Sequence, residues 1–297
     1  MPDFRLLVFQ RVAQNLSFTK AANELFISQP AITKHIKELE SEYGTKLFER
    51  SGNKILLTEA GTVFLNYANQ ILQLHNELKF ELGQLTNQFK GTLRLGASTT
   101  IAQYVLPSAL ASFHDRHPDV KLSLISGNTE FIEKRLLRNE IDFAIVEGKP
   151  SNQDIRYTPY LDDELLVFTS SKNNNIAASV SNSELVSVPL VLRERGSGTL
   201  EIIEENLHNH NISPRQLNVL MYLGSTEAIK TFIKTGKGAG IVSRFAIENE
   251  LNEKQFRQIA TPEISFKRQF YFIFPQGPEP TGFTKLFCDF LSMSHNR

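Results

Sequence analysis

The sequence predicts an α/β protein of several domains, and three observations lead to that prediction. Residues 1–58 carry short amphipathic helical patterns followed by a polar turn. Residues 59–89 form one long helical pattern without proline. From residue 90 to residue 297, short apolar strands alternate with helical stretches, which is typical of sheets covered by helices. A chain of 297 residues is long enough for two or three such domains.

Two short helices are expected in the first domain, separated by the break Phe26-Ile27-Ser28. Ser17 can cap the first helix and Ser28 the second, while Pro30 is tolerated in a first turn, where no intrahelical amide bond is lost. The apolar positions of the second helix recur at spacings of four and three, which predicts a buried stripe of Ile32, Ile36 and Leu39.

The opposite face of the second helix is polar. It presents amide, hydroxyl and ammonium groups from the N-terminal half of the helix, namely Gln29, Pro30, Thr33, Lys34 and Lys37. A glutamine can pair with adenine in the major groove, and a lysine can reach guanine or phosphate. The solvated face of an ordinary helical hairpin would show the same pattern, so both interpretations stay open at this point.

A β-hairpin is expected after the two helices. Leu47 and Phe48 should pack inward, the turn lies at Ser51-Gly52-Asn53, and residues 55–57 resemble a short strand. Arg50 and Lys54 flank the turn, so the tip of the hairpin carries cations. Two helices followed by such a hairpin form a winged helix-turn-helix.

The helix over residues 59–89 has an apolar seam. Its members recur at spacings of three and four and continue after a one-residue shift: Phe64, Tyr67, Ile71, Leu74, Leu78, Leu82, Leu85 and Phe89. Such a seam requires a partner helix, and we expect a homodimer. If the second helix reads DNA, a dimer would present two such helices to two half-sites of a roughly palindromic operator. Packing on the chain's own core is the alternative.

Seven strands are expected in the third domain, over residues 92–96, 120–125, 142–146, 165–169, 190–193, 240–243 and 269–274. Helical patterns lie between most of them, over residues 106–116, 131–138, 200–208 and 226–235. This alternation predicts parallel sheets. The strands divide into two groups, so we expect lobe 1 at about 90–162 and 268–297, and lobe 2 at about 163–267.

Each lobe has a strand that runs into a hydroxyl-bearing turn at a helix start. Such turns offer backbone amides and hydroxyl donors to an anion, and ligands of parallel α/β sheets lie at the carboxyl ends of strands. The candidates are Ser98, Thr99, Thr100 and Gln103 in lobe 1, Ser197, Gly198 and Thr199 with Arg193 and Arg195 in lobe 2, and Asn128 and Thr129 closing the site. The same hydroxyls can equally be ordinary helix N-caps.

Composition limits the classes of partner and the cellular compartment that the protein can have. Lys plus Arg and Asp plus Glu number 32 each, so DNA binding requires a locally basic surface. The single cysteine, Cys288, cannot form an internal disulfide, which fits a reducing compartment. Neither a signal peptide nor a membrane-spanning apolar run is visible, so we expect a cytoplasmic protein without a membrane partner.

No catalytic or metal-binding set is visible in the sequence. His208 and His210 lie near Glu204 and Glu205, but no third ligand stands at a convincing spacing. We therefore expect no enzyme activity, no metal and no cofactor.

The block FTKAANELFISQPAITKHIKELESEYGTKLFERSGNKILLTEAG resembles the N-terminal domain of LysR-type transcriptional regulators. The elements Phe-Thr-x-Ala-Ala, Ser-Gln-Pro-Ala, Leu-Glu and Leu-Phe-x-Arg occur in order and at the expected spacing, and the length and layout extend the resemblance over the whole chain. The resemblance implies a winged helix-turn-helix, a linker helix and a two-lobed effector domain similar to periplasmic solute-binding proteins. The implied partners are double-stranded DNA and the chain itself, as homodimers that often assemble further into homotetramers.

The resemblance also assigns roles to residues. The exposed set of the second helix would contact bases and backbone, with Arg50 and Lys54 in the wing. The stretches GASTTIAQYVLP and RERGSGTLE look most like the branch that controls sulfur-assimilation and carbon-fixation genes, which implies a small anionic effector of unknown identity bound between the lobes. In one departure, Leu200 stands where that branch frequently has arginine, which weakens the case for a strongly charged phosphate.

A different class of protein is the alternative: a solute-binding protein or an enzyme that carries a helical N-terminal domain without reading DNA. A solute-binding protein would require export, for which no signal is visible. An enzyme would require a nucleophile, an acid–base pair or a metal set, and none is found in the sequence.

Overall fold

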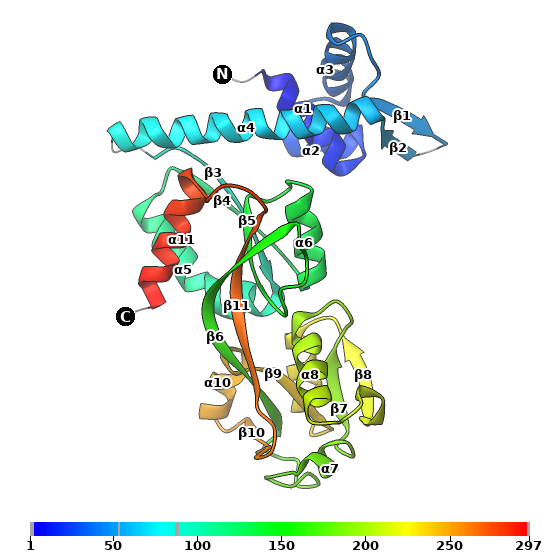
Figure 1. Ribbon diagram of the computed structural model, residues 1–297, viewed down its shortest axis with the longest axis vertical. Coiled ribbons are helices and arrows are strands. Elements are labelled where there is room, and N and C mark those ends of the chain that lie inside the picture. The colour runs from blue at the N-terminus through cyan, green and yellow to red at the C-terminus, as the bar shows by residue number, and fades with distance from the viewer. Residues whose placement is uncertain (1–2, 53, 87–88, 296–297) are drawn as a thin grey trace. The chain divides into compact units, whose positions relative to one another are not determined.

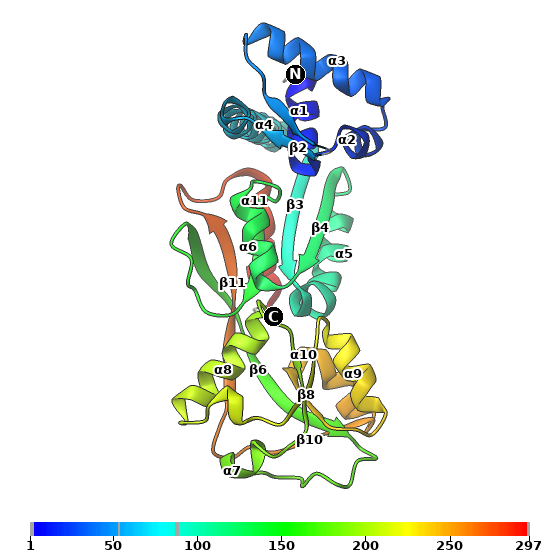
Figure 2. The ribbon, with the colours of Figure 1, turned by 90° about the vertical axis from the view of Figure 1, so that its right-hand side faces the viewer.

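The computed structural model describes residues 3–52, 54–86 and 89–295, which fold into two compact units (Figures 1 and 2). One unit comprises Met1–Thr92 with Thr281–Phe283, and the other comprises Leu93–Pro280 with Thr284–Arg297. Asn53, in the expected hairpin turn, lies outside the described residues.

The first unit contains four helices and a hairpin among its described residues: α1 (Phe4–Asn15), α2 (Phe18–Leu25), α3 (Gln29–Glu42), β1 (Phe48–Ser51), β2 (Lys54–Leu57) and α4 (Glu59–Thr86). Ser17 and Ser28 cap α2 and α3 as expected, since their hydroxyls accept the amides of Lys20 and Ala31, each at 3.3 Å. The predicted stripe of α3 is buried against α1 and α2: Ile32, Ile36 and Leu39.

The hairpin and the start of α4 are tightly joined. β1 and β2 pair antiparallel, as predicted for the wing. The Thr58 hydroxyl accepts the Gly61 amide at 2.9 Å, capping α4, and donates to the Lys46 carbonyl at 2.7 Å. A Cβ on Gly61 would lie 2.0 Å from the Leu47 carbonyl oxygen. The helix therefore leaves the wing at a fixed angle.

The seam predicted along α4 is wrong at its two ends. The Phe64 ring lies 4.7 Å from that of Phe9 in the unit's own core, and the Phe89 ring lies 5.6 Å from that of Phe80. An exposed apolar stripe remains, with spacings of four, four and three that repeat: Val63, Tyr67, Ile71, Leu74, Leu78, Leu82 and Leu85. The buried positions of α4 lie on the other side of the helix: Gly61, Ala68, Asn69, Phe80 and Gly83.

The second unit is built on a nine-stranded sheet of order β4-β3-β5-β11-β6-β9-β7-β8, with β10 also paired to β6. Its strands are β3 (Gly91–Ser98), β4 (Val120–Gly127), β5 (Phe143–Glu147), β6 (Ile155–Ser170), β7 (Leu190–Arg193), β8 (Val219–Leu223), β9 (Ala239–Ser243), β10 (Phe256–Gln258) and β11 (Phe266–Pro275). Figures 1 and 2 show β6 and β11 running side by side through both groups of strands.

The sheet is mixed, whereas parallel sheets were expected. Parallel pairs occur within each group, β3 with β5 and β7 with both β8 and β9. The long strands β6 and β11 pair antiparallel with each other, and they also pair antiparallel with β5 and β9. The two groups of strands are thus joined through one antiparallel ribbon.

Sequence patterning missed β8, β10 and the first half of β6. β8 alternates half-buried and exposed residues, and the early part of β6 is mostly half-buried or exposed, so neither shows an apolar run. The strand expected from residue 142 starts at Phe143. Asp142, just before it, accepts the Arg94 backbone amide at 2.7 Å through its carboxylate and ion-pairs with the Arg94 guanidinium.

Helices cover the sheet: η1 (Ile101–Val105), α5 (Leu106–Arg116), α6 (Thr129–Leu137), α7 (Asn182–Leu185), α8 (Gly198–Asn209), η2 (Pro214–Gln216), α9 (Thr226–Lys234), α10 (Arg244–Asn252) and α11 (Gly282–His295). The four expected helices are confirmed as α5, α6, α8 and α9. Separate apolar clusters form around α6 with β5 and around α8 with β7. Within the described residues, no helix is long and apolar enough to cross a membrane.

Candidate functional site

The N-terminal half of α3 forms a polar surface. Gln29, Pro30, Lys34 and Lys37 are exposed, and Thr33 is half-buried. The side-chain amide of Gln29 donates to the Thr33 hydroxyl at 2.9 Å, and that hydroxyl donates to the backbone carbonyl of Gln29 at 3.1 Å. Neighbouring hydrogen bonds thus hold the amide in place beside two lysines, while the opposite side of α3 is fixed in the core.

A groove lies between α3 and the wing within the first unit. Polar and basic side chains contribute much of its lining: Ser17, Gln29, Thr33, Lys37, Lys46 and Arg50. Arg50 and Lys54 are exposed on β1 and β2. This surface has the donors that a phosphate backbone and base edges require.

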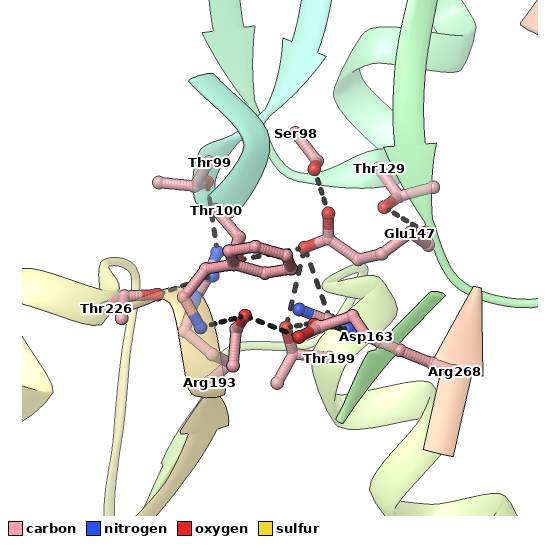
Figure 3. Close-up of polar contacts among 12 residues, drawn as sticks. Ser98, Thr99, Thr100, Thr129, Glu147, Asp163, Arg193, Thr199, Thr226 and Arg268 are labelled. Carbon is pink, nitrogen blue, oxygen red and sulfur yellow. Dashed lines mark hydrogen bonds and ion pairs between the residues drawn. The ribbon is translucent and has the colours of Figure 1, made fainter. Parts of the chain in front are cut away.

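A buried polar cluster lies in the second unit, around Glu147 at the end of β5 (Figure 3). The Glu147 residue is 2% exposed. Its carboxylate accepts a hydrogen bond from Ser98 and longer ones, at 3.4 Å each, from Thr100 and Thr199. Figure 3 shows Ser98 on one side of this carboxylate, and Thr199 and Arg268 on the other.

The cluster continues across the two long strands. The Arg268 Nε atom lies 2.7 Å from Asp163 Oδ2, and both side chains are fully buried. Arg268 Nη1 donates to Thr199 at 2.8 Å and lies 3.7 Å from Glu147 Oε1. Ser243 donates to the other Asp163 oxygen at 2.9 Å.

A second buried guanidinium, Arg193 at the end of β7, lies beside the cluster. It ion-pairs with both oxygens of Glu194, at 2.8 and 3.0 Å. Its Nη2 donates to Thr99 at 3.3 Å, and its Nη1 faces Thr226 at 3.5 Å. Arg193 thereby links the turn after β3 with the start of α9.

Burial is the largest influence on the Glu147 carboxyl and raises its pKa above the ordinary value. The cations Arg268 and Arg193 act in the opposite direction, and Asp163 adds to the rise. The balance keeps the pKa raised, so this carboxyl binds a proton more readily than a carboxyl in water does.

Most of the predicted effector residues come together here. Ser98, Thr100, Thr129 and Thr199 surround Glu147, with the Thr129 hydroxyl donating to the Glu147 carbonyl at 2.7 Å. Gln103 and Arg195 are instead exposed.

The N-cap alternative fits one of the predicted residues. The Asn128 side chain accepts the Phe131 amide at 2.9 Å and so caps α6, while its amide faces Glu194 at 3.4 Å. Ser197 occupies the N-cap position of α8 without capping it, and its hydroxyl is buried without a hydrogen-bond partner among the described residues. Thr100 likewise makes no cap bond to η1.

Sequence patterning missed Glu147, Asp163 and Arg268. Each is a charged residue inside or at the end of an apolar strand, as in FAIVE and FKRQFYFIF. Charged side chains are almost never fully buried unless they are paired, so a charge in such a strand is a signal of a buried partner. The identity of that partner depends on strand pairing that periodicity does not reveal.

Comparisons with known proteins agree with this architecture. Residues 5–62 match the family model described as bacterial regulatory helix-turn-helix protein, lysR family, and residues 86–294 match that of the LysR substrate binding domain. A probable RuBisCO transcriptional regulator of Thalassiosira pseudonana is 36% identical over 270 residues, 89% of this chain and 88% of the relative. The regulator CysL of Bacillus subtilis is 28% identical over 291 residues, 98% of this chain and 96% of the relative.

Solved structures show the same fold. The regulatory domain of Synechocystis PCC6803 CcmR, in complex with 2-PG, matches with a TM-score of 0.62 and 30% identity, over 69% of this chain and 97% of that chain. Full-length CbnR with its target DNA matches with a TM-score of 0.64 and 21% identity, over 99% of this chain and 100% of that chain.

Replacing Gly198 tests the close approach at the start of α8. An added Cβ would lie 2.2 Å from the Glu147 carbonyl oxygen and 2.8 Å from the Thr129 hydroxyl. Because the first of these neighbours is backbone, Gly198→Ala should lower the free energy of unfolding of the second unit by roughly 1–3 kcal/mol, seen as a lower midpoint in thermal unfolding. Gly224→Ala is the matched control, since a Cβ there meets nothing within 4 Å. Equal midpoints for the two variants would contradict the packing described.

Proposed function

Because this chain belongs to the LysR family of bacterial helix-turn-helix transcription regulators, we propose that α3 and the wing read its operator and that the buried cluster around Glu147 binds a small anionic effector. A regulator that binds chromosomal DNA acts in the compartment that contains the chromosome, so we also assign this protein to the cytoplasm. We propose that the chain passes from lobe 1 to lobe 2 between residues 162 and 163 and returns between residues 267 and 268. Asp163 then belongs to lobe 2 and Arg268 to lobe 1.

The reading role rests on one observation: the exposed donors of α3 stand on a helix whose other face is locked in the core. Side chains that contact bases must be held in position, and Ile32, Ile36 and Leu39 provide that support. We assign base and backbone contacts to Gln29, Pro30, Thr33, Lys34 and Lys37, and phosphate contacts to Arg50 and Lys54. The structural neighbour CbnR was solved with its target DNA, in line with this assignment.

A second copy of the chain is the partner proposed for α4. One side of this helix is buried in its own unit, and the other carries seven exposed apolar residues in a continuous stripe. A long exposed apolar stripe on a single helix calls for a matching helix, and a symmetric pair would place two α3 helices on two half-sites.

The effector role rests on the buried donors. Ser197 Oγ and Arg268 Nη2 are buried without hydrogen-bond partners among the described residues, and both belong to the elements around Glu147. Buried donors without acceptors are costly, so a ligand that supplies acceptor oxygens would be stabilised there. The relative CcmR was solved with 2-PG, which makes 2-PG a suitable first probe.

Substitutions on α3 test the reading surface. Lys34→Ala should weaken binding to DNA directly upstream of the gene and reduce the salt slope by about one if Lys34 contacts a phosphate. Gln29→Ala should cost about 1–3 kcal/mol of discrimination if its amide pairs with a base. Gel-shift titrations at several salt concentrations measure both effects. Lys121→Ala, an exposed lysine on β4, is the control. Parent-like binding by both α3 variants would overturn the assignment.

A charge placed in the α4 stripe tests self-pairing. Leu74→Glu should convert dimers into monomers at micromolar concentration, because two carboxylates would be buried opposite apolar neighbours. Sedimentation velocity measures the change. Gln84→Glu introduces the same charge at an exposed position outside the stripe and should leave the dimer intact. A Leu74→Glu protein that sediments as the parent does would exclude this interface.

Removing the Ser197 hydroxyl tests the effector site. This hydroxyl has no hydrogen-bond partner among the residues that the structure describes, so Ser197→Ala should leave the free protein as stable as the parent while reducing thermal stabilisation by 2-PG. A lost hydrogen bond to a charged ligand should lower affinity by roughly 10- to 100-fold. Ser123→Ala, on an exposed part of β4, is the control. Equal stabilisation of the Ser197→Ala protein and the parent would place the effector elsewhere.

A further inference from the structure

The buried cluster contains one carboxyl group more than it has guanidinium groups. Its cations are Arg193 and Arg268, and its carboxyls are Glu147, Asp163 and Glu194. Asp163 pairs with Arg268 at 2.7 Å, and Glu194 accepts hydrogen bonds from Nε and Nη2 of Arg193. Glu147 keeps only the longer 3.7 Å contact to Arg268. It is therefore the carboxyl without a cation of its own.

Hydroxyls make the nearest contacts of the Glu147 carboxyl. Ser98, Thr100 and Thr199 all lie within hydrogen-bond distance of it. A hydroxyl donates to a carboxylate and accepts from a carboxyl, so this setting holds Glu147 in either protonation state.

Charged groups face Glu147 from several elements. They are Asp163 on β6, Arg193 on β7, Arg268 on β11 and Glu201 on α8. β3 and α6 contribute hydroxyls, Ser98 and Thr129. Two of the four charged groups are negative, and Asp163 acts together with burial, which is the largest influence, to raise the pKa of Glu147.

An oxyanion that binds in this cluster would be attracted by the buried donors and repelled by the carboxylates. Arg268 Nη2 and Ser197 Oγ offer buried donors. The ionised form of Glu147 would oppose the ligand's negative charge at short range in a poorly solvated place. A proton that the ligand donates to the carboxylate turns this contact into a charge-assisted hydrogen bond, which offsets that repulsion.

We propose that Glu147 makes the effector site selective for oxyanions that still carry a proton near neutral pH, such as hydrogen phosphate, over sulfate and sulfonates of similar shape. The proposal rests on the effector site assigned under the proposed function. A hydrogen phosphate donates its proton to the Glu147 carboxylate. Sulfate has none to donate, so it binds only when Glu147 has taken a proton from water.

The two classes of ligand then differ in their pH dependence. Sulfate binding takes up one proton at Glu147, so its affinity should fall by up to about tenfold per pH unit once the pH exceeds the pKa of that carboxyl. Phosphate brings the proton with it and should bind with a much weaker dependence. The preference for phosphate therefore grows as the pH rises.

Isothermal titration of the full chain with inorganic phosphate and with sulfate, at pH 6 and pH 8, tests the proposal. The parent should prefer phosphate by roughly 10- to 100-fold at pH 8. Glu147→Gln should reduce the preference to within about threefold, mainly by binding sulfate better, because the Gln amide donates to either anion without a negative charge. It should also remove the pH dependence of sulfate binding.

The matched control is Glu133→Gln on α6. Burial also raises the pKa of Glu133, which accepts a hydrogen bond from Tyr157 at 2.7 Å and is not one of the cluster's carboxyls. This variant should keep the parent's preference and pH dependence.

The outcomes separate the two proposals. Equal and pH-independent binding of phosphate and sulfate by the parent would overturn the selectivity of Glu147 and leave an anionic effector site standing. Failure of phosphate, sulfate and 2-PG alike to bind would overturn the effector site itself. If Glu147→Gln does not fold, the parent's own comparison at the two pH values decides the question.

Discussion

The ion pair between Arg268 and Asp163 is the constraint on which the second unit depends. The two residues are direct partners in the antiparallel register of β11 and β6, and both side chains are fully buried. Breaking such a pair by a shift in register would leave a buried charge without compensation, at a cost of several kcal/mol. The pair therefore favours this alignment of the two long strands, against which β5 and β9 are paired.

That alignment explains why the donors around Glu147 gather without forming helix caps. In α2, α3, α6 and α9 the N-cap side chain accepts a backbone amide, whereas in α8 Ser197 does not. Gly198 lets the start of α8 approach the Glu147 carbonyl closely. The Ser197 hydroxyl therefore does not contribute the stability that a helix N-cap usually provides. A role in binding a ligand would explain why it does not cap the helix.

The helix-turn-helix and the wing of the first unit were predictable because they follow from local sequence signals, whereas the ends of the α4 seam were not. Caps at Ser17 and Ser28, the buried stripe of α3 and the turn of the wing all depend on neighbours within a few residues. The second unit was predictable only in part, since β6 and β11 pair over about a hundred residues of sequence separation. The hydroxyl turns carried a local signal, but Arg268 and Asp163 acquire their role only through that distant pairing.

The stripe on α4 constrains how two reading helices would be spaced. Its spacings of four, four and three repeat every eleven residues, which favours nearly straight or slightly right-handed pairing over a left-handed heptad coil. Because Gly61 packs against the Leu47 carbonyl and Thr58 ties α4 to Lys46, the helix and the wing form one body. The register in which two α4 helices pair would then determine the distance between the two α3 helices. That distance would in turn determine the separation of the half-sites.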